Sequence, residues 1–120
     1  RPNMYTNHIN TVCVSGEVNK VIIRPEYDTI MLILDNKQEM DRNGKIEMVV
    51  SSIQVKIPQD LYDKEFKEII RGDNLMISGC LVTDKVHSGE LTVVRVQAQK
   101  LIHRAPKPIE GFGGSRFLTR

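Results

Sequence analysis

The sequence has no tryptophan, only two cysteines and few aromatic side chains, and the shortage of cysteine excludes one class of protein. Cys13 and Cys80 cannot form the dense disulfide framework of small secreted domains, and neither has a partner at metal-ligand spacing, so we expect two free thiols. The apolar runs, such as 30–34, fall far short of the roughly 20 residues that a helix needs to cross a bilayer. No secretory signal pattern opens the chain. We therefore expect a soluble cytoplasmic protein without membrane association.

Patterns that carry catalysis or metal binding are also missing. The three histidines are scattered over different predicted elements, at His8, His87 and His103. None stands at ligand spacing with Cys, Asp or Glu, so no metal and no cofactor is predicted. A nuclease would need clustered carboxylates that hold a cation, whereas Asp35, Asp41 and Glu47 belong to a polar hairpin. We predict no enzymatic activity.

What the sequence does contain is the composition of one folded domain. Its 120 residues suit a single core, and 40% apolar with 27% charged residues is ordinary for a globular protein. The net charge is only +2, but it is unevenly distributed. Residues 46–73 hold four basic and six acidic side chains, whereas residues 100–120 hold five basic and one acidic. Positive charge therefore gathers in the C-terminal segment.

Alternation of apolar and polar residues with a period of two dominates the chain, and this pattern is typical of half-buried strands. The predicted strands span about residues 11–20, 27–34, 45–57, 74–83 and 90–102. Gly16 predicts a sharp bend in the first strand. The apolar phase shifts between Val50 and Ile53 and again near Val93–Val94, which predicts one β-bulge in the third strand and another in the fifth.

One helix is predicted between the third and fourth strands. Pro58 suits its first turn, Asp60 favours its positive end and Gly72 ends it. The apolar residues at helical spacing are Tyr62, Phe66, Ile69 and Ile70. Polar turns are predicted at 35–36, 41–44 and 87–89. Three strands, a helix and two strands are the order of the five-stranded Greek-key barrel, so the predicted fold is all-β with one helix.

Two segments of the chain carry recognisable motifs. In one, Asn10-Thr11-Val12 opens the first predicted strand and Gly16 follows four residues later. In the other, residues 70–81 (IRGDNLMISGCL) form a basic-Gly-Asp turn into a strand that closes on Gly-x-Leu. Over about residues 9–103 the chain thus resembles the bacterial and phage single-stranded DNA-binding proteins. The resemblance implies an OB fold, sequence-tolerant binding of single strands, and dimers or tetramers assembled around the first strand. The expected location is the cytoplasm of a bacterium or a phage-infected host, with an organelle matrix as the alternative.

The predicted organisation has three parts: an N-terminal extension (1–8), the OB-fold domain (9–104) and a flexible basic tail (105–120) with two Pro and three Gly. Many members of the family carry a long linker and an acidic tip that recruits replication enzymes, and this basic tail departs from that pattern. The aromatic and basic residues Phe112, Arg116 and Phe117 are candidates for extending the strand-binding path or for docking on a neighbouring subunit. The alternative is a disordered end.

Binding a single strand requires cations along the phosphates and flat side chains for stacking. The candidate residues are Lys20, Arg24, Tyr27, Arg42, Lys45, Lys85, His87 and Arg95. OB folds hold oligonucleotides in the loops after the first and fourth strands, which favours Arg24 and Lys85. The alternative for each cation is a solvated surface charge, and for Tyr27 a residue that covers the barrel rim. Met31 and Met48 are candidates for contacts with bases, with burial or subunit packing as the alternative.

The sequence thus predicts a protein that binds single-stranded DNA, or RNA, without strong sequence preference, and protects or organises it in DNA replication, recombination or repair. We expect a homo-oligomer, with replication proteins as further partners. Because aromatic residues are few, cations rather than stacking should provide the affinity. The alternative is an OB-fold interaction or oligomerisation module with little nucleic-acid affinity. In that reading the apolar outer residues Met31, Ile33 and Val82 serve assembly.

Overall fold

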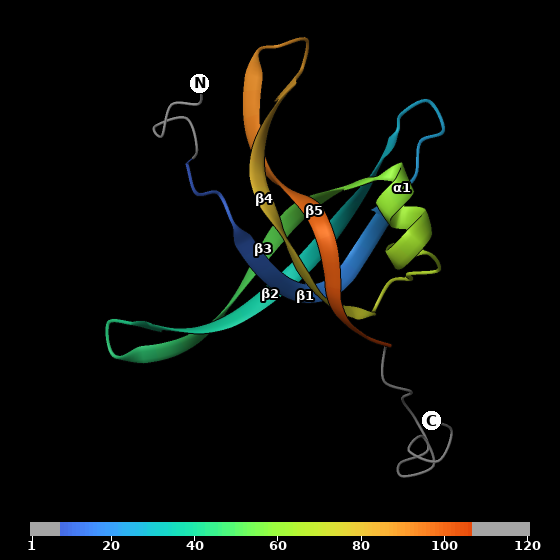
Figure 1. Cartoon of the computed structure of the whole chain (residues 1–120). Helices are drawn as coiled ribbons and strands as arrows, with labels where there is room; N and C mark the ends of the chain where they lie inside the picture. Colours follow the sequence, from blue (N-terminus) through green and yellow to red (C-terminus); the bar gives the residue numbers. More distant parts are fainter. Residues whose placement is uncertain (1–7, 107–120) are drawn as a thin grey trace, which may run out of the picture.

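The computed structural model describes residues 8–106, and these form one closed five-stranded barrel (Figure 1). The elements are, in order, β1 (Val12–Ile22), β2 (Thr29–Arg42), β3 (Lys45–Pro58), α1 (Gln59–Leu61), the π-helical turn η2 (Tyr62–Phe66), β4 (Asn74–Val86) and β5 (Leu91–Ala105). Neighbouring strands follow the order β1-β2-β3-β5-β4, and the barrel closes where β4 pairs with β1. The predicted Greek-key barrel, with its helical segment between the third and fourth strands, is confirmed.

Two hairpin ribbons project from this barrel. The contact between β3 and β5 is parallel and short, with Val55 opposite Val96 and Lys56 opposite Gln97. Beyond it, β2 and β3 continue as one ribbon (residues 36–51, the β2–β3 ribbon) and β4 and β5 as another (residues 82–95, the β4–β5 ribbon). Figure 1 shows the two ribbons pointing in different directions, the first in blue-green and the second in orange.

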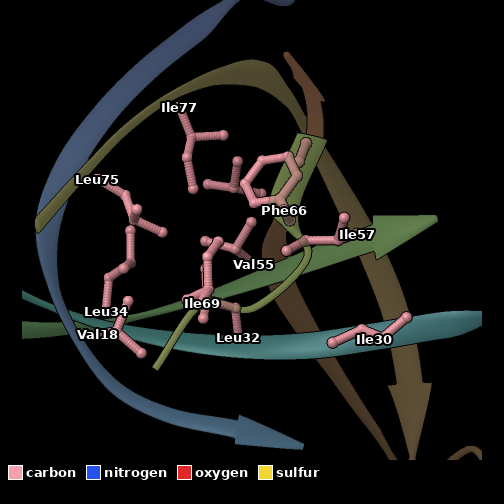
Figure 2. Packing of buried hydrophobic residues seen from close by; sticks show 12 residues of the cluster. Val18, Ile30, Leu32, Leu34, Val55, Ile57, Phe66, Ile69, Leu75 and Ile77 are labelled. Atoms are coloured by element: carbon pink, nitrogen blue, oxygen red, sulfur yellow. The ribbon is translucent and has the colours of Figure 1, made fainter. Parts of the chain in front are cut away.

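The barrel interior is filled by side chains that take every second position along the strands. The inward residues of the strands are Val18, Ile30, Leu32, Leu34, Val55, Ile57, Leu75, Ile77, Val96 and Ala98. Phe66 from η2 and Ile69 from the loop after it pack into the same cluster (Figure 2). Because inward and outward positions alternate, the residues of β2 and β3 between these core positions face the outside of the barrel.

Gly16 and Gly79 stand where a neighbouring strand comes too close for a side chain. A Cβ on Gly16 would lie 2.8 Å from the carbonyl oxygen of Asp35, and a Cβ on Gly79 would overlap the carbonyl oxygen of Gln97. Both glycines occupy inward positions of their strands, in phase with Val18 and Ile77. Close approach of the backbones therefore explains why these positions lack an apolar side chain.

The connection between β2 and β3 is shorter than the sequence predicted. Residues 35–42 continue β2 and pair with residues 45–52 of β3, so the turn is Asn43–Gly44 alone. Its two residues have positive φ angles of +54° and +82°, as a two-residue Asn-Gly hairpin turn requires. The polar residues of 35–42 were interpreted as part of a loop because they lie on a ribbon that both faces leave open to solvent.

The predicted bulge in β3 is wrong. β3 pairs with β2 in unbroken register from Pro58 to the turn. The apolar phase changes because the strand leaves the barrel: Ile53 packs against the core, whereas the outer face of the ribbon carries Ile46, Met48 and Val50. These three side chains are 73%, 59% and 54% exposed.

Register shifts do occur, at other places than the sequence indicated. One lies in β1 between Val18 and Lys20, where Asn19 has no partner in β2. The others lie where β5 pairs with residues 76–79 of β4, whereas Val93–Val94 pair in regular register. A bulge in β5 is thus confirmed, but its predicted position is wrong.

The helical segment is also shorter than predicted. It begins after Pro58, as expected, but ends at Phe66, and Glu68 turns the chain with a φ of +68°. Ile69 therefore reaches the core from a loop rather than from a helix. Gly72 does not end the helix but stands, with a φ of +99°, in the turn into β4.

The turn at residues 71–73 ties β1 to β4 and β5. The Gly72 amide donates to the carbonyl oxygen of Val18 at 2.8 Å, and the Val18 amide donates to that of Asp73, also at 2.8 Å. The buried Asp73 carboxylate accepts a hydrogen bond from the Ile70 amide at 3.1 Å and pairs with Arg104 Nη2 at 3.2 Å. Residues 71–73, which belong to the motif at 70–81, therefore help to hold the barrel together.

Replacing Asp73 with alanine is expected to lower the free energy of unfolding by about 2–3 kcal/mol, because the Ile70 amide and the Arg104 guanidinium lose a charged acceptor. Urea titration followed by circular dichroism measures the change. Asp60→Ala removes an exposed carboxylate from α1 and should change the stability by less than about 0.5 kcal/mol. Equal losses in the two variants would contradict the structural role of the turn.

Some of the predicted features lie outside the described residues 8–106. The tail candidates Phe112, Arg116 and Phe117 lie outside residues 8–106, so their role and the proposed division at residues 8 and 104 stay predictions. Within the described residues, no helix is long and apolar enough to span a membrane.

Candidate nucleic-acid interface

A groove of about 560 Å³ lies on the outer face of the barrel, between the loop that follows β1 and the β4–β5 ribbon. It is lined by Ile22, Arg24, Tyr27, Thr29, Met31, Ile33, Gln54, Lys56, Asp84, Lys85, Val86 and Arg95. In Figure 1 the loop after β1 and the β4–β5 ribbon rise on the same side of the barrel. The groove is therefore bounded by the loop after β1 and by strand residues of the β4–β5 ribbon, beside the positions where OB folds hold oligonucleotides.

The floor of the groove follows from the alternation of β2 and β3. The neighbours of Met31 and Ile33 in β2 face the core, so these two side chains face outward. In register, Met31 lies opposite Lys56 and Ile33 opposite Gln54, which places an apolar row beside a polar row. Such a floor can carry the apolar faces of bases on one side and a charged backbone on the other.

Four of the eight predicted site residues line the groove, namely Arg24, Tyr27, Lys85 and Arg95. They come from three separate parts of the chain: the loop after β1, the end of β4 and the middle of β5. Met31, predicted as a contact for bases, lies on the floor. The barrel thus brings together Arg24 and Lys85, which the sequence favoured, although Lys85 belongs to β4 and not to the predicted loop after the fourth strand.

The other four predicted residues lie outside the groove. Lys20 belongs to β1, and it is exposed opposite Ile33 at the border of the groove. Arg42 and Lys45 lie opposite each other in the strand register, at the tip of the β2–β3 ribbon. His87 stands in the turn of the β4–β5 ribbon with a φ of +54°.

The groove residues that the sequence prediction missed include Gln54, Lys56 and Asp84. A signal for Lys56 was present, because it stands between Val55 and Ile57 in a predicted strand and so had to face outward if they face inward. Nothing in the sequence indicated Asp84 as its partner, because their contact depends on how β3 lies beside the β4–β5 ribbon.

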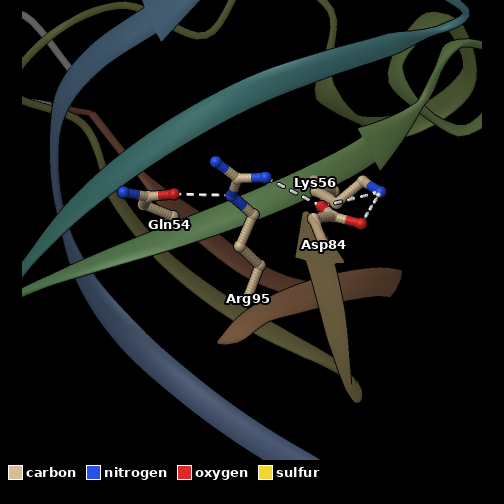
Figure 3. Close-up of polar contacts among 4 residues, drawn as sticks. All are labelled: Gln54, Lys56, Asp84 and Arg95. Atoms are coloured by element: carbon tan, nitrogen blue, oxygen red, sulfur yellow. Dashed lines mark hydrogen bonds and ion pairs between the residues drawn. The ribbon is translucent and has the colours of Figure 1, made fainter. Parts of the chain in front are cut away.

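These charged residues form a connected cluster (Figure 3). Asp84 Oδ2 lies 2.8 Å from Arg95 Nη1 and 3.0 Å from Lys56 Nζ, and Arg95 Nε donates to Gln54 Oε1 at 2.6 Å. The hydrogen bond from Arg95, followed by that from Lys56, holds the pKa of the Asp84 carboxyl below its ordinary value. Asp84 is therefore ionised at neutral pH, and its side chain and those of both cations are each less than one quarter exposed.

Tyr27 is the one aromatic side chain among the groove residues, and it is 55% exposed. It lies in the turn before β2, where its amide donates to the carbonyl oxygen of Arg24 at 3.0 Å. This turn places a guanidinium and a phenol ring at the same wall of the groove. An exposed ring next to a cation is suited to stack on one base while the cation meets the adjacent phosphate.

The carboxylates considered for nuclease chemistry do not gather. Asp41 and Glu47 lie near the tip of the β2–β3 ribbon but on opposite faces. Asp35 lies opposite Ser52, at the base of that ribbon and outside it. Among residues 8–106, no group of three or more His, Cys, Asp or Glu is placed to hold a metal ion. Cys13 and Cys80 are free thiols on the outside of β1 and β4.

Comparison of the sequence with protein-family models and with curated proteins gives no match. Comparison of the fold gives clear ones. The chain matches the single-stranded DNA-binding protein (SSB) of Plasmodium falciparum in complex with single-stranded DNA with a TM-score of 0.63 and 15% identity, over 77% of this chain and 88% of that one. It matches a small single-stranded DNA-binding protein from Mycoplasma pneumoniae with a TM-score of 0.55 and 13% identity, over 80% and 94% of the two chains.

The barrel is therefore an OB fold of the arrangement found in single-stranded DNA-binding proteins. A further match is the dimeric N-terminal domain of PriB from Thermoanaerobacter tencongensis, with a TM-score of 0.56, 18% identity, and 82% of this chain and 98% of that one covered. At identities of 13–18% these likenesses define the fold, and what the groove does has to be argued from its own residues.

Proposed function

We propose that this protein binds single-stranded DNA without strong sequence preference, and that the strand lies in the groove between the loop after β1 and the β4–β5 ribbon. The observation that carries the proposal is the gathering of Arg24, Lys56, Lys85 and Arg95 around one groove of an OB fold. Backbone phosphates would meet these cations, which carry no sequence information. One base would stack on Tyr27, and others would lie on Met31 and Ile33.

A role in replication, recombination or repair accords with this binding mode, because single strands are exposed in all three processes. The fold neighbours include a protein described in complex with single-stranded DNA and a dimeric one. For this chain we propose a dimer or tetramer, in which grooves of several copies bind one strand and so raise the apparent affinity.

The second candidate is an interaction or oligomerisation module. It is favoured by the outer face of the β2–β3 ribbon, where Ile46, Met48 and Val50 are each more than half exposed. Exposed apolar side chains on one face of a projecting ribbon are suited to packing against another protein surface. Under this candidate the groove would have little affinity for nucleic acid.

A binding titration distinguishes the two candidates. Fluorescence anisotropy of a labelled oligo-dT should show binding that weakens as the salt concentration rises, with a slope of log K against log salt of about −1.4 to −2.8 for two to four phosphate contacts. A duplex of the same length should bind more weakly, because the groove floor requires exposed base faces. An oligo-rU of equal length measures the preference between DNA and RNA.

Absence of binding to oligo-dT at low salt, or equal affinity for the strand and the duplex, would contradict the proposed function. The first result would favour the interaction module, whose oligomeric state light scattering can then measure.

A further inference from the structure

The groove that should bind a polyanion contains an anion of its own. Asp84 points from β4 toward two of the four groove cations, Lys56 of β3 and Arg95 of β5 (Figure 3). Its carboxylate meets Lys56 Nζ at 3.0 Å and Arg95 Nη1 at 2.8 Å, which are the distances of charge-assisted hydrogen bonds. Within residues 8–106 the other two groove cations, Arg24 and Lys85, form no ion pair. Half of the positive charge is thus already engaged.

A carboxylate and a phosphate use the same donors. Both accept hydrogen bonds from guanidinium and ammonium groups through oxygens of negative charge, so a strand that enters the groove meets Lys56 and Arg95 with part of their hydrogen-bonding capacity occupied. The Asp84 side chain is 24% exposed, as is that of Lys56, and only 17% of Arg95 is exposed. At such partial burial a charge pair is screened less by solvent and salt than a pair on an open surface.

We propose that Asp84 acts as a built-in competitor of the phosphate backbone, which sets the affinity of the groove for single strands and keeps the bound strand exchangeable. The proposal rests on the proposed function of the groove. A bound strand must share or replace the Asp84 contacts with Lys56 and Arg95, and the energy of those contacts is subtracted from the binding energy. This lower binding energy lets the bound strand dissociate more readily.

The opposite role for Asp84, holding the cations in place for phosphate, is disfavoured by the geometry. Arg95 has a second anchor, because its Nε donates to Gln54 Oε1 at 2.6 Å. Lys56 lies near the barrel end of the β2–β3 pairing, where its backbone is fixed opposite Met31. Both cations would keep their places in the groove without the carboxylate.

The test replaces Asp84 with asparagine, which keeps the shape of the side chain and removes its charge. In a titration with labelled oligo-dT, D84N should bind about fivefold or more tightly than the wild type at low salt. The slope of log K against log salt should steepen by about 0.7 for each cation released. Two controls accompany it: D60N removes the same charge from α1, outside the groove, and D84E keeps the charge at the site. Both should bind within about twofold of the wild type.

A second measurement assigns the effect to the two cations. In a K56Q/R95Q background, the change produced by D84N should shrink to that produced by D60N, because there is no pair left to release. Thermal unfolding followed by circular dichroism verifies that each variant is folded.

The outcomes separate this inference from the proposed function. If the wild type binds oligo-dT with the expected salt dependence and D84N binds equally or more weakly, the competitor role is wrong and the proposed function stands. If neither protein binds oligo-dT, both are wrong. Tighter binding by D84N with a steeper salt slope supports the competitor role, and persistence of the full effect in the K56Q/R95Q background contradicts it.

Discussion

Replacing Phe66 with alanine should lower the free energy of unfolding by about 3–5 kcal/mol, which is a large part of the stability of a domain of this size. Phe66 is the largest fully buried side chain of the barrel, with 0% exposure. It comes from η2 and lies in the core cluster beside Val55 and Ile57 of β3 and Ile77 of β4 (Figure 2). Its removal takes away a large apolar surface and leaves a cavity, because a closed barrel cannot collapse into the space.

The measurement is thermal and urea unfolding, with an expected fall of the midpoint temperature by about 15–30 °C. Ile70→Ala is the matched control, since Ile70 lies four residues further along and is 62% exposed. It should change the stability by less than about 0.5 kcal/mol. Phe66→Leu should lose about 1–2 kcal/mol, because leucine refills part of the cavity. Similar losses for Phe66→Ala and Ile70→Ala would show that the helical segment does not complete the core.

The sequence predicted the barrel well because burial on one face leaves a periodic record. Val18, Ile30 and Leu32 alternate with exposed or half-exposed residues, and the structure places all three in the core. The apolar period is lost in residues 35–42 of β2, which are mostly polar and lie on a ribbon open to solvent on both faces. The second strand was therefore predicted too short, whereas the third, whose ribbon part carries Ile46, Met48 and Val50, was predicted nearly in full.

The candidate site could be predicted from loops but not from strand pairing. Arg24 and Lys85 were favoured because they were predicted to lie in the loops after the first and fourth strands, and the barrel brings both to one groove, although Lys85 belongs to β4. The contact of Asp84 with Arg95 lies within the β4–β5 hairpin, whereas its contact with Lys56 joins residues 28 positions apart. The Lys56 contact depends on the short parallel contact between β3 and β5, which no local pattern indicates.

The largest expected effect on binding comes from removing the groove cations together. The variant R24Q/K56Q/K85Q/R95Q changes the formal charge of the groove from +3 to −1, because Asp84 remains. Each phosphate contact contributes about 0.7 of a log unit to the affinity for a single strand at 0.1 M salt, so with two to four contacts binding to oligo-dT should weaken by roughly one and a half to three log units. The dependence of log K on log salt should become nearly flat, since few counterions are released.

The matched control removes the same number of positive charges elsewhere. K64Q/K67Q/R71Q/K100Q changes four exposed residues that do not line the groove. Long-range attraction, which depends on net charge, should fall equally in both variants, and it is screened beyond about 10 Å at 0.1 M salt. A loss confined to the first variant therefore assigns the binding to the groove. Equal losses would place the strand elsewhere on the molecule, and in that case Asp84 would have no phosphate to compete with.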